Sequence, residues 1–158
     1  MAHEYTATVS WKRDGAVFTD LKFSRAHHWN FDGGITVQAS SSPLSVRVPF
    51  SKAEAVDPEE ALVAALSSCH MLTFLYLAAK RGFVVDSYDD GAVGVMTKND
   101  RGKLFVSKVA LRPRIVFSDA KQPSDADLAD LHHHAHEECY IANSVLAEVV
   151  VEAPASSK

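Results

Sequence analysis

The chain has 158 residues, of which 47% are hydrophobic and 23% are charged, and its formal net charge is -4. These values are typical of one globular domain, which we take to span residues 1–158. They do not suggest a nucleic-acid-binding protein, which would carry a concentrated basic surface.

The N-terminal third is rich in β-branched and aromatic residues that alternate with polar ones, a pattern typical of strands. Turn signals at residues 13–15 and 33–34 divide it. The predicted strands are residues 3–11, 16–24, 35–42 and, between two prolines, the edge strand 44–48. The aromatic and histidine-rich segment around Arg25 is predicted to be a loop beside a pocket.

A long helix is predicted next. Asp57 is a suitable N-cap, Pro58 suits the first helical position, and Glu60 completes a capping-box pattern. The helix is expected to run to about Arg81 and to end at Gly82, which can adopt the left-handed conformation of a helix C-terminus.

Residues 61–79 of this helix are almost uncharged and approach the length of a membrane span. Polar residues lie at their centre, from Ser67 to His70, and no second span follows. We therefore interpret the helix as the buried centre of a protein that does not enter the membrane. A single small chain has few layers to cover such a helix, so we expect a homodimer.

The remaining sequence favours strands at 83–100 and 103–117, arranged as an antiparallel meander. A second helix is predicted from Pro123 to about Cys139, followed by a last strand at 144–153. Strands and helices do not alternate as they would around a parallel sheet. The fold class is therefore α+β with antiparallel sheets.

The chain has two cysteines, Cys69 in the middle of the first helix and Cys139 at the end of the second. Each could be a buried, inert thiol. The N-terminus lacks a signal peptide, so we expect a cytoplasmic location, where disulfides are more often transient and catalytic than structural. Two cysteines are the minimum for a cycle in which one thiolate attacks a peroxide and a second thiol resolves the sulfenic acid.

A histidine cluster favours a different chemistry. His132 and His136 lie one helical turn apart, and Cys139 follows one turn later, so one helix face offers two imidazoles and a thiol. These are zinc ligands, with His27, His28 or His70 as a possible further ligand. Metal binding is therefore an alternative function, although the spacing supplies only part of a ligand set.

A thiolate in an apolar pocket needs a nearby cation, because burial otherwise favours the neutral thiol. Arg25 is the first candidate, and Arg13 and Arg47 are the others in the N-terminal region. Glu59, in the first turn of the helix, could simply complement the helix dipole.

Two segments resemble a known family. Residues 57–71, DPEEALVAALSSCHM, are similar to the helix motif of OsmC-family proteins, in which a Pro-Glu pair precedes a mid-helix cysteine. Residues 132–145, HHHAHEECYIANSV, resemble the segment around the second cysteine of that family.

The resemblance implies an intertwined α+β homodimer in which antiparallel sheets wrap around long central helices. It implies a thiol-dependent peroxidase that reduces organic hydroperoxides, with no cofactor and no bound metal. Cys69 falls on the peroxidatic position and Cys139 on the resolving position. Glu59 falls on the active-site glutamate, and Arg25 is the best match for the arginine that holds the thiolate.

The expected partners are a second copy of the chain, a small hydroperoxide and a dithiol reductant. Because Glu59 and Cys69 are far apart on one helix, we expect each site to combine Cys69 and Cys139 of one chain with Glu59 and Arg25 of its partner. Besides metal binding, a non-enzymatic redox sensor is a further alternative.

Overall fold

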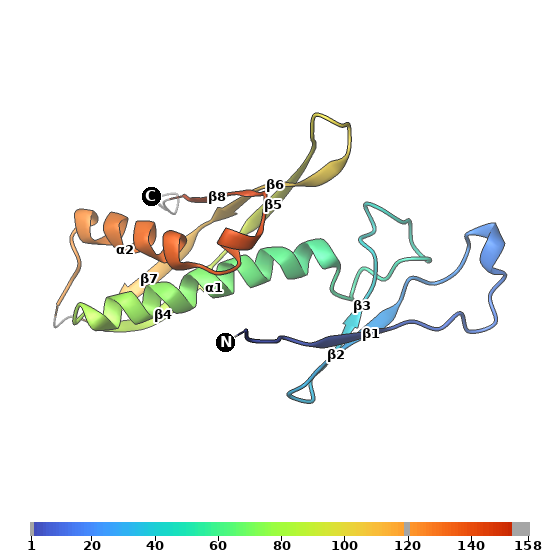
Figure 1. Cartoon of the computed structure of the whole chain (residues 1–158), viewed down its shortest axis with the longest axis horizontal. Helices are drawn as coiled ribbons and strands as arrows, with labels where there is room; N and C mark the ends of the chain where they lie inside the picture. The colour runs from blue at the N-terminus through green and yellow to red at the C-terminus, as the bar shows by residue number, and fades with distance from the viewer. Residues whose placement is uncertain (1, 119–120, 153–158) are drawn as a thin grey trace. The chain divides into compact units, whose positions relative to one another are not determined.

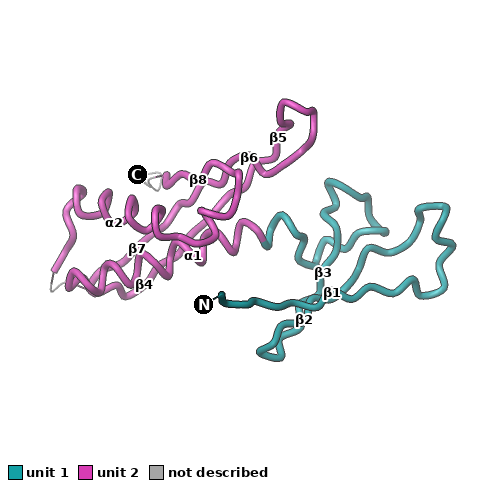
Figure 2. The backbone as a smooth tube through the Cα atoms, viewed as in Figure 1, with its two compact units in different colours: residues 1–61 teal, residues 62–158 magenta. Residues whose placement is uncertain are grey.

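The computed structural model describes residues 2–118 and 121–152. The chain divides into two compact units, residues 1–61 and residues 62–158 (Figure 2). Two α-helices and eight strands are found among the described residues, and all strand pairs but one are antiparallel within the named sheets. The predicted α+β class is confirmed.

The first unit contains a three-stranded antiparallel sheet in the order β1-β2-β3. The strands are β1 (Ala7–Ser10), β2 (His27–Phe31) and β3 (Thr36–Ala39). Gly34 lies in the tight turn between β2 and β3, where its φ of +84° suits a residue without a side chain. The predicted strands around β1 and β3 are therefore present, although both are shorter than expected.

Three predictions in this unit were wrong. Residues 16–24 contain the 3-10 helix η1 (Phe18–Asp20) instead of a strand, because Phe18 stacks on Phe23 with ring centroids 4.5 Å apart and folds the segment into a compact loop. Residues 44–48 form turns. The segment after Arg25, predicted as a loop, is the central strand β2. Its aromatic residues favour a strand, although two histidines lie in the same segment.

Helix α1 (Pro58–Lys80) begins and ends as its sequence predicts. The Glu60 backbone N–H donates to the Asp57 carboxylate (2.8 Å), and the Asp57 N–H donates to the Glu60 carboxylate (3.1 Å), which is a capping box. At the other end Gly82 has a φ of +77° and the Phe83 N–H donates to the Ala78 carbonyl, the Schellman arrangement.

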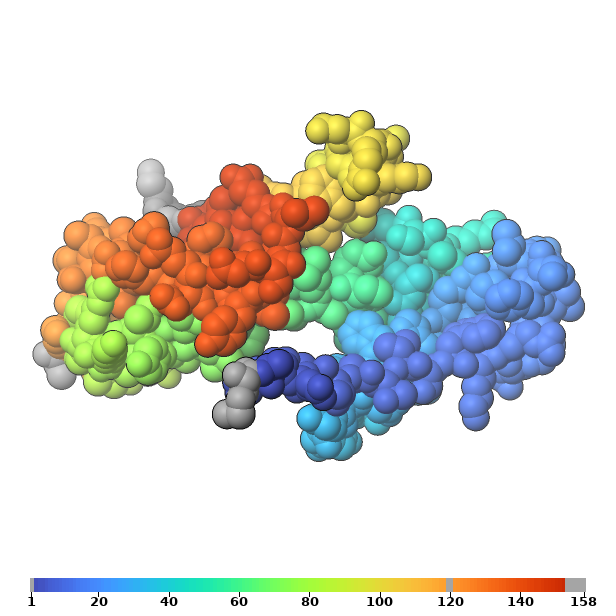
Figure 3. All heavy atoms as spheres, in the orientation of Figure 1, coloured from blue at the N-terminus to red at the C-terminus, as the bar shows by residue number. Residues whose placement is uncertain are grey.

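The second unit holds strands in two sheets, both on the same face of α1 and α2 (Figure 1). One sheet pairs β4 (Val85–Asp90) with β7 (Pro113–Phe117), and the other has β5 (Val93–Lys98), β6 (Leu104–Leu111) and β8 (Glu148–Val151). The predicted antiparallel pairing of residues 83–100 with 103–117 is confirmed: β4 with β7 and β5 with β6 keep one register, in which Asp90 faces Pro113 and Val93 faces Ala110. The last strand, β8, joins β6 in parallel. Strand β8 returns after a helix, so it can enter the sheet in either direction. The hairpin between β5 and β6 stands out from the body of this unit (Figure 3).

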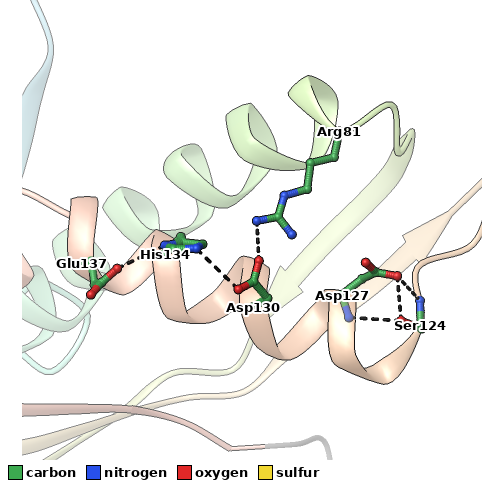
Figure 4. A network of polar contacts seen from close by, with 6 residues as sticks. All are labelled: Arg81, Ser124, Asp127, Asp130, His134 and Glu137. Atoms are coloured by element: carbon green, nitrogen blue, oxygen red, sulfur yellow. Dashed lines mark hydrogen bonds and ion pairs between the residues drawn. The ribbon is translucent and has the colours of Figure 1, made fainter.

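Helix α2 (Asp125–Glu138) is fixed at its N-terminus by a second capping box, between Ser124 and Asp127. The side chain of Asp130 pairs with Arg81 beyond the end of α1, and His134 bridges Asp130 and Glu137 (Figure 4). These exposed ion pairs contribute little each, so α2 is held chiefly by its buried face.

The core of the second unit consists of two apolar clusters. The first joins both helices to β4 and β7; its buried members are Phe74, Ala78, Phe83, Leu131 and Ala135. The second joins α1 to β6; its buried members are Leu66, Val109 and Leu111. The two clusters fix α1 against the strands and α2 against α1.

By length and composition α1 is apolar enough to cross a membrane, with a mean hydropathy of 1.7. One stripe of the helix, residues Leu66, His70, Phe74 and Ala78, is nevertheless buried against the core of its unit, as in the core helix that the sequence predicts. Only 22% of the apolar window is buried in the described chain. Much of the helix therefore lacks a cover within one copy.

Candidate dithiol site

The structure brings the two cysteines together. Cys69 is half-buried on α1, and Cys139 is the C-cap of α2 with only 1% of its surface exposed. Both are free thiols. Burial, assisted by a hydrogen bond between the two side chains, raises the pKa of Cys139 to about 11. Cys139 is therefore a protonated thiol at neutral pH, held within hydrogen-bonding reach of Cys69.

The end of α2 explains how Cys139 reaches this position. Leu131, Ala135 and Cys139 are spaced four residues apart and are all buried, so they form one stripe that packs toward α1. The Cys139 sulfur accepts a hydrogen bond from the Ala142 N–H at 3.4 Å. The Asn143 side chain donates to the Cys139 carbonyl at 3.0 Å. The loop after the helix thus holds the thiol in place.

A histidine pair joins the same two helices through His70, the residue after Cys69, and His132, about two turns before Cys139. His70 is 1% exposed, and its Nε2 lies 3.0 Å from Nδ1 of His132 on α2. The ring planes differ by only 10°, which fits an in-plane hydrogen bond between the two imidazoles. Phe74 packs against His132 with ring centroids 4.6 Å apart. The pair is a polar contact that joins α1 to α2 inside an apolar core.

Burial sets the protonation state of this pair. It is the largest cause that lowers the pKa of His70 to about 4, followed by the charges that His132 and His136 would carry, while Asp90 opposes the shift. Burial also lowers the pKa of His132, again against the influence of Asp90. Both imidazoles are consequently neutral at pH 7. Asp90 itself accepts a hydrogen bond from Ser67 on α1 at 2.5 Å.

Sequence reasoning considered His70 only as an extra metal ligand and missed its pairing with His132. A signal was present: His70 occupies the second position of a stripe in which every fourth residue is buried, Leu66, His70, Phe74 and Ala78. A polar side chain in such a stripe needs a buried partner. The partner could not be named, because the register between α1 and α2 depends on tertiary packing.

The predicted zinc face is not assembled. The described residues contain no group of three or more His, Cys, Asp or Glu side chains placed to share a metal ion. His132 is hydrogen-bonded to His70, so one of the three proposed ligands already has another partner. The three-ligand site that the spacing allowed is therefore absent from this arrangement.

Arg25 and Glu59 belong to the first unit, whereas both cysteines belong to the second. The Arg25 guanidinium donates to the carbonyls of Leu21 and Phe23 and lies 3.8 Å from the centre of the Phe23 ring. It lines a pocket of about 430 Å³ with the aromatic side chains of that unit. Glu59 is half-buried in the first turn of α1.

The other arginines that the sequence offered are placed differently. Arg47 is exposed and lies 5.9 Å from the centre of the Phe50 ring, and Arg13 is exposed. Of the three candidates, only Arg25 is half-buried and lines a pocket in the described part of the first unit. This placement favours Arg25 without linking it to Cys69.

An α+β scaffold whose two helices bring a pair of free thiols together defines a class of dithiol proteins. This chain belongs to the OsmC-like protein family, whose sequence model matches residues 51–153. The chain is similar to an OsmC-like protein of unknown function from Vibrio cholerae, with 56% sequence identity and a TM-score of 0.94. That similarity covers 96% of this chain and 99% of the other.

More distant structures share the fold. An organic hydroperoxide resistance protein from Elizabethkingia anophelis is 16% identical, with a TM-score of 0.70 over 100% of this chain and 99% of that one. An organic hydroperoxide resistance protein OsmC from Legionella pneumophila is 12% identical, with a TM-score of 0.66 over 98% and 99% of the two chains. No curated protein sequence matches this chain significantly.

Proposed function

We propose that this protein is a thiol-dependent peroxidase that reduces organic hydroperoxides to alcohols. The observation that carries the proposal is the pair of free thiols, Cys69 on α1 and Cys139 at the end of α2, which are near enough for Cys69 to contribute to the raised pKa of Cys139. Membership of the OsmC-like family supports it, as do two structures of the same fold that are named organic hydroperoxide resistance proteins.

The surroundings of the thiols favour one division of roles. Cys69 is the more accessible of the two, so a peroxide can approach it, whereas Cys139 is buried. The pKa of Cys139, raised to about 11, keeps its proton in place until a sulfenic acid forms beside it. Cys69 is therefore the attacking thiolate and Cys139 the resolving thiol.

The cycle has three steps. The Cys69 thiolate attacks the distal oxygen of ROOH; the O–O bond breaks, RO⁻ leaves and takes up a proton to give ROH, and Cys69 is oxidised to a sulfenic acid. The Cys139 thiol then attacks the Cys69 sulfur, forming a disulfide and releasing water. A dithiol reductant exchanges with this disulfide, becomes oxidised itself and restores both thiols.

Arg25 and Glu59 enter the proposal through a homodimer. In this arrangement Arg25 and Glu59 of one copy complete the site around Cys69 and Cys139 of the other. The exposed apolar side chains of α1 support a dimer, since Leu72 and Tyr76 are 61% and 64% exposed in the single chain. A guanidinium beside Cys69 would favour its thiolate, and Glu59 would orient the guanidinium.

Peroxide consumption tests the proposal. Wild-type protein with dithiothreitol should turn over cumene hydroperoxide and tert-butyl hydroperoxide faster than hydrogen peroxide. Cys69→Ser should abolish the reaction with all three. In the absence of dithiothreitol, which would itself reduce a sulfenic acid, Cys139→Ser should consume one equivalent per chain and stop, with a sulfenic acid at Cys69 that dimedone labels.

Each alternative has its own result. A redox sensor would react once per chain even when both cysteines and the reductant are present. If Cys139→Ser, and not Cys69→Ser, removed the first equivalent, the two roles would be reversed.

A further inference from the structure

We propose that a second pocket in residues 62–158, between α2 and strands β7 and β8, binds a small amphiphilic carboxylate such as a medium-chain fatty acid. The pocket has a volume of about 620 Å³, within the range of natural ligand sites. Neither cysteine lines it. The site is therefore additional to the dithiol centre.

The pocket has one polar side and one apolar side. Helix α2 contributes three imidazoles, those of His132, His133 and His136. The strands contribute mostly apolar side chains, namely Pro113, Ile115, Phe117, Val149 and Val151. Helix α2 and strand β8 lie near each other in this unit (Figure 1). A ligand that fits both sides carries a hydrocarbon body and a polar head.

The hydrogen bond within the histidine pair determines which kind of polar head group the pocket can bind. Nδ1 of His70 is buried and has no hydrogen-bond partner among the described residues, while Nε2 of His70 is hydrogen-bonded to Nδ1 of His132. Buried N–H groups without partners are rarer in proteins than acceptors without partners. The hydrogen of neutral His70 accordingly sits on Nε2 and is donated to Nδ1 of His132.

This tautomer fixes the chemistry of His132. Its Nδ1 accepts from His70, so its own hydrogen sits on Nε2, the only nitrogen left for the pocket that His132 lines. An Nε2–H donor recognises an acceptor. It cannot bind a metal ion without moving its hydrogen to Nδ1, which would force an unpartnered N–H onto the buried His70.

The charges around the pocket do not oppose an anionic acceptor. Glu152, the one carboxylate among the described residues of the lining, is paired with Lys108 at 3.3 Å and with Arg112 at 3.0 Å. The two cations offset the charge of Glu152, although Asp90 also acts on His132. A hydrogen bond from His132 to a carboxylate is also stronger than one to a neutral oxygen.

Calorimetry on the full-length protein tests the proposal with decanoate and 1-decanol, which share the same chain length. Decanoate should bind, and 1-decanol should bind at least about tenfold more weakly, because it lacks the charged acceptor. In methyl-labelled protein, decanoate should shift the signals of Ile115, Leu128 and Val149. Equal affinity for both ligands, no binding, or shifts confined to residues of the first unit would overturn the proposal.

Three variants complete the test. His132→Leu should weaken decanoate binding by about tenfold, the loss expected for a hydrogen bond to a charged group. His134→Leu is the control, because His134 lies on the same helix but pairs with Asp130 and Glu137 outside the pocket. If His132→Leu does not fold, Val151→Trp, which fills the apolar side, should abolish binding while leaving the histidine pair intact.

The tautomer can be read directly. Nitrogen-15 spectra of the wild-type protein at pH 7 should show His132 with its hydrogen on Nε2. A hydrogen on Nδ1 of His132 would remove the donor from the pocket and refute the proposal, whatever the variants show.

Discussion

Cys69 and His70 are adjacent in α1, whereas His132 and Cys139 are about two turns apart along α2, and each pair joins the same two helices. Cys69 and His70 are neighbours in sequence but point to different partners, Cys139 and His132. Any shift of α2 along α1 therefore changes both pairs at once. The histidine pair thereby acts as a positioning contact for the resolving thiol.

The histidine pair also makes stability depend on pH. The pKa of His70 falls from 6.5 in the unfolded chain to about 4 in the folded state, so the unfolded chain takes up a proton first as the pH falls. Stability contributed by neutral His70 is present above pH 6.5 and is lost between pH 6.5 and 4. His132 shifts in the same direction.

We expect the free energy of unfolding to fall by about 2 kcal/mol between pH 7 and pH 5 through His70 alone. Urea denaturation of the wild type and of His70→Gln at both pH values measures this, since the variant cannot titrate at position 70. The difference between the two proteins should shrink at pH 5. A difference that does not depend on pH would contradict the assignment of a neutral buried His70.

At the scale of helices and strands, local sequence signals were sufficient to predict the ends of a helix. The capping box at Asp57 and Glu60 and the terminal Gly82 are properties of neighbouring residues, so the limits of α1 were predictable. The antiparallel pairing of 83–100 with 103–117 was predictable as well, because a short turn joins the two segments. The parallel entry of β8 beside β6 was not, because it depends on contacts between residues far apart in sequence.

The same limit applies to the site. The chemistry of Cys69 and Cys139 could be suggested from their types, but their proximity depends on the packing of α2 on α1. The segment around η1 illustrates the converse: Phe18 and Phe23 satisfy a strand pattern, yet they stack on each other within a loop. Composition alone does not separate these two outcomes.

The packing of α1 on β5 leaves no room for a side chain at Gly94. A Cβ atom there would lie 2.6 Å from Cγ2 of Val63 on α1. We expect Gly94→Ala to lower the free energy of unfolding by about 1–3 kcal/mol, the usual cost of overpacking. Chemical denaturation measures the loss.

Two further variants show whether the contact is the cause. Val63→Ala combined with Gly94→Ala should recover part of the loss, with a coupling energy of about 1 kcal/mol in the double-mutant cycle. Gly91→Ala, where a Cβ would meet nothing within 4 Å, should change stability by less than about 0.5 kcal/mol. Equal losses at Gly91 and Gly94 would point to backbone effects instead.

At the scale of the whole molecule, the groups proposed for one site are divided between two units of the chain. Cys69 and Cys139 lie in residues 62–158, and Arg25 and Glu59 in residues 1–61. Glu59 and Cys69 are also ten positions apart on the continuous helix α1, or about 15 Å along its axis. An arginine side chain of the same chain cannot easily contact both.

A shared site in a homodimer resolves this separation. If two copies of α1 pack antiparallel, Glu59 of one copy comes close to the level of Cys69 of the other. The same packing would cover the apolar side chains of α1 that one copy leaves exposed, such as Leu72 and Tyr76. The proposed dimer thus has two equivalent sites, each built from both chains.

Complementation tests this division. Cys69→Ser and Glu59→Ala proteins, each inactive alone, are mixed, unfolded, refolded together and assayed for peroxide consumption. Random pairing makes half of the dimers mixed, and each mixed dimer has one intact site with Cys69 from one chain and Glu59 from the other. Activity should therefore recover to about a quarter of the wild-type value.

The control replaces the Glu59→Ala partner with a chain that carries both substitutions, which should restore nothing. If mass spectrometry shows that mixed dimers form and these dimers remain inactive, all the site residues lie in a single chain.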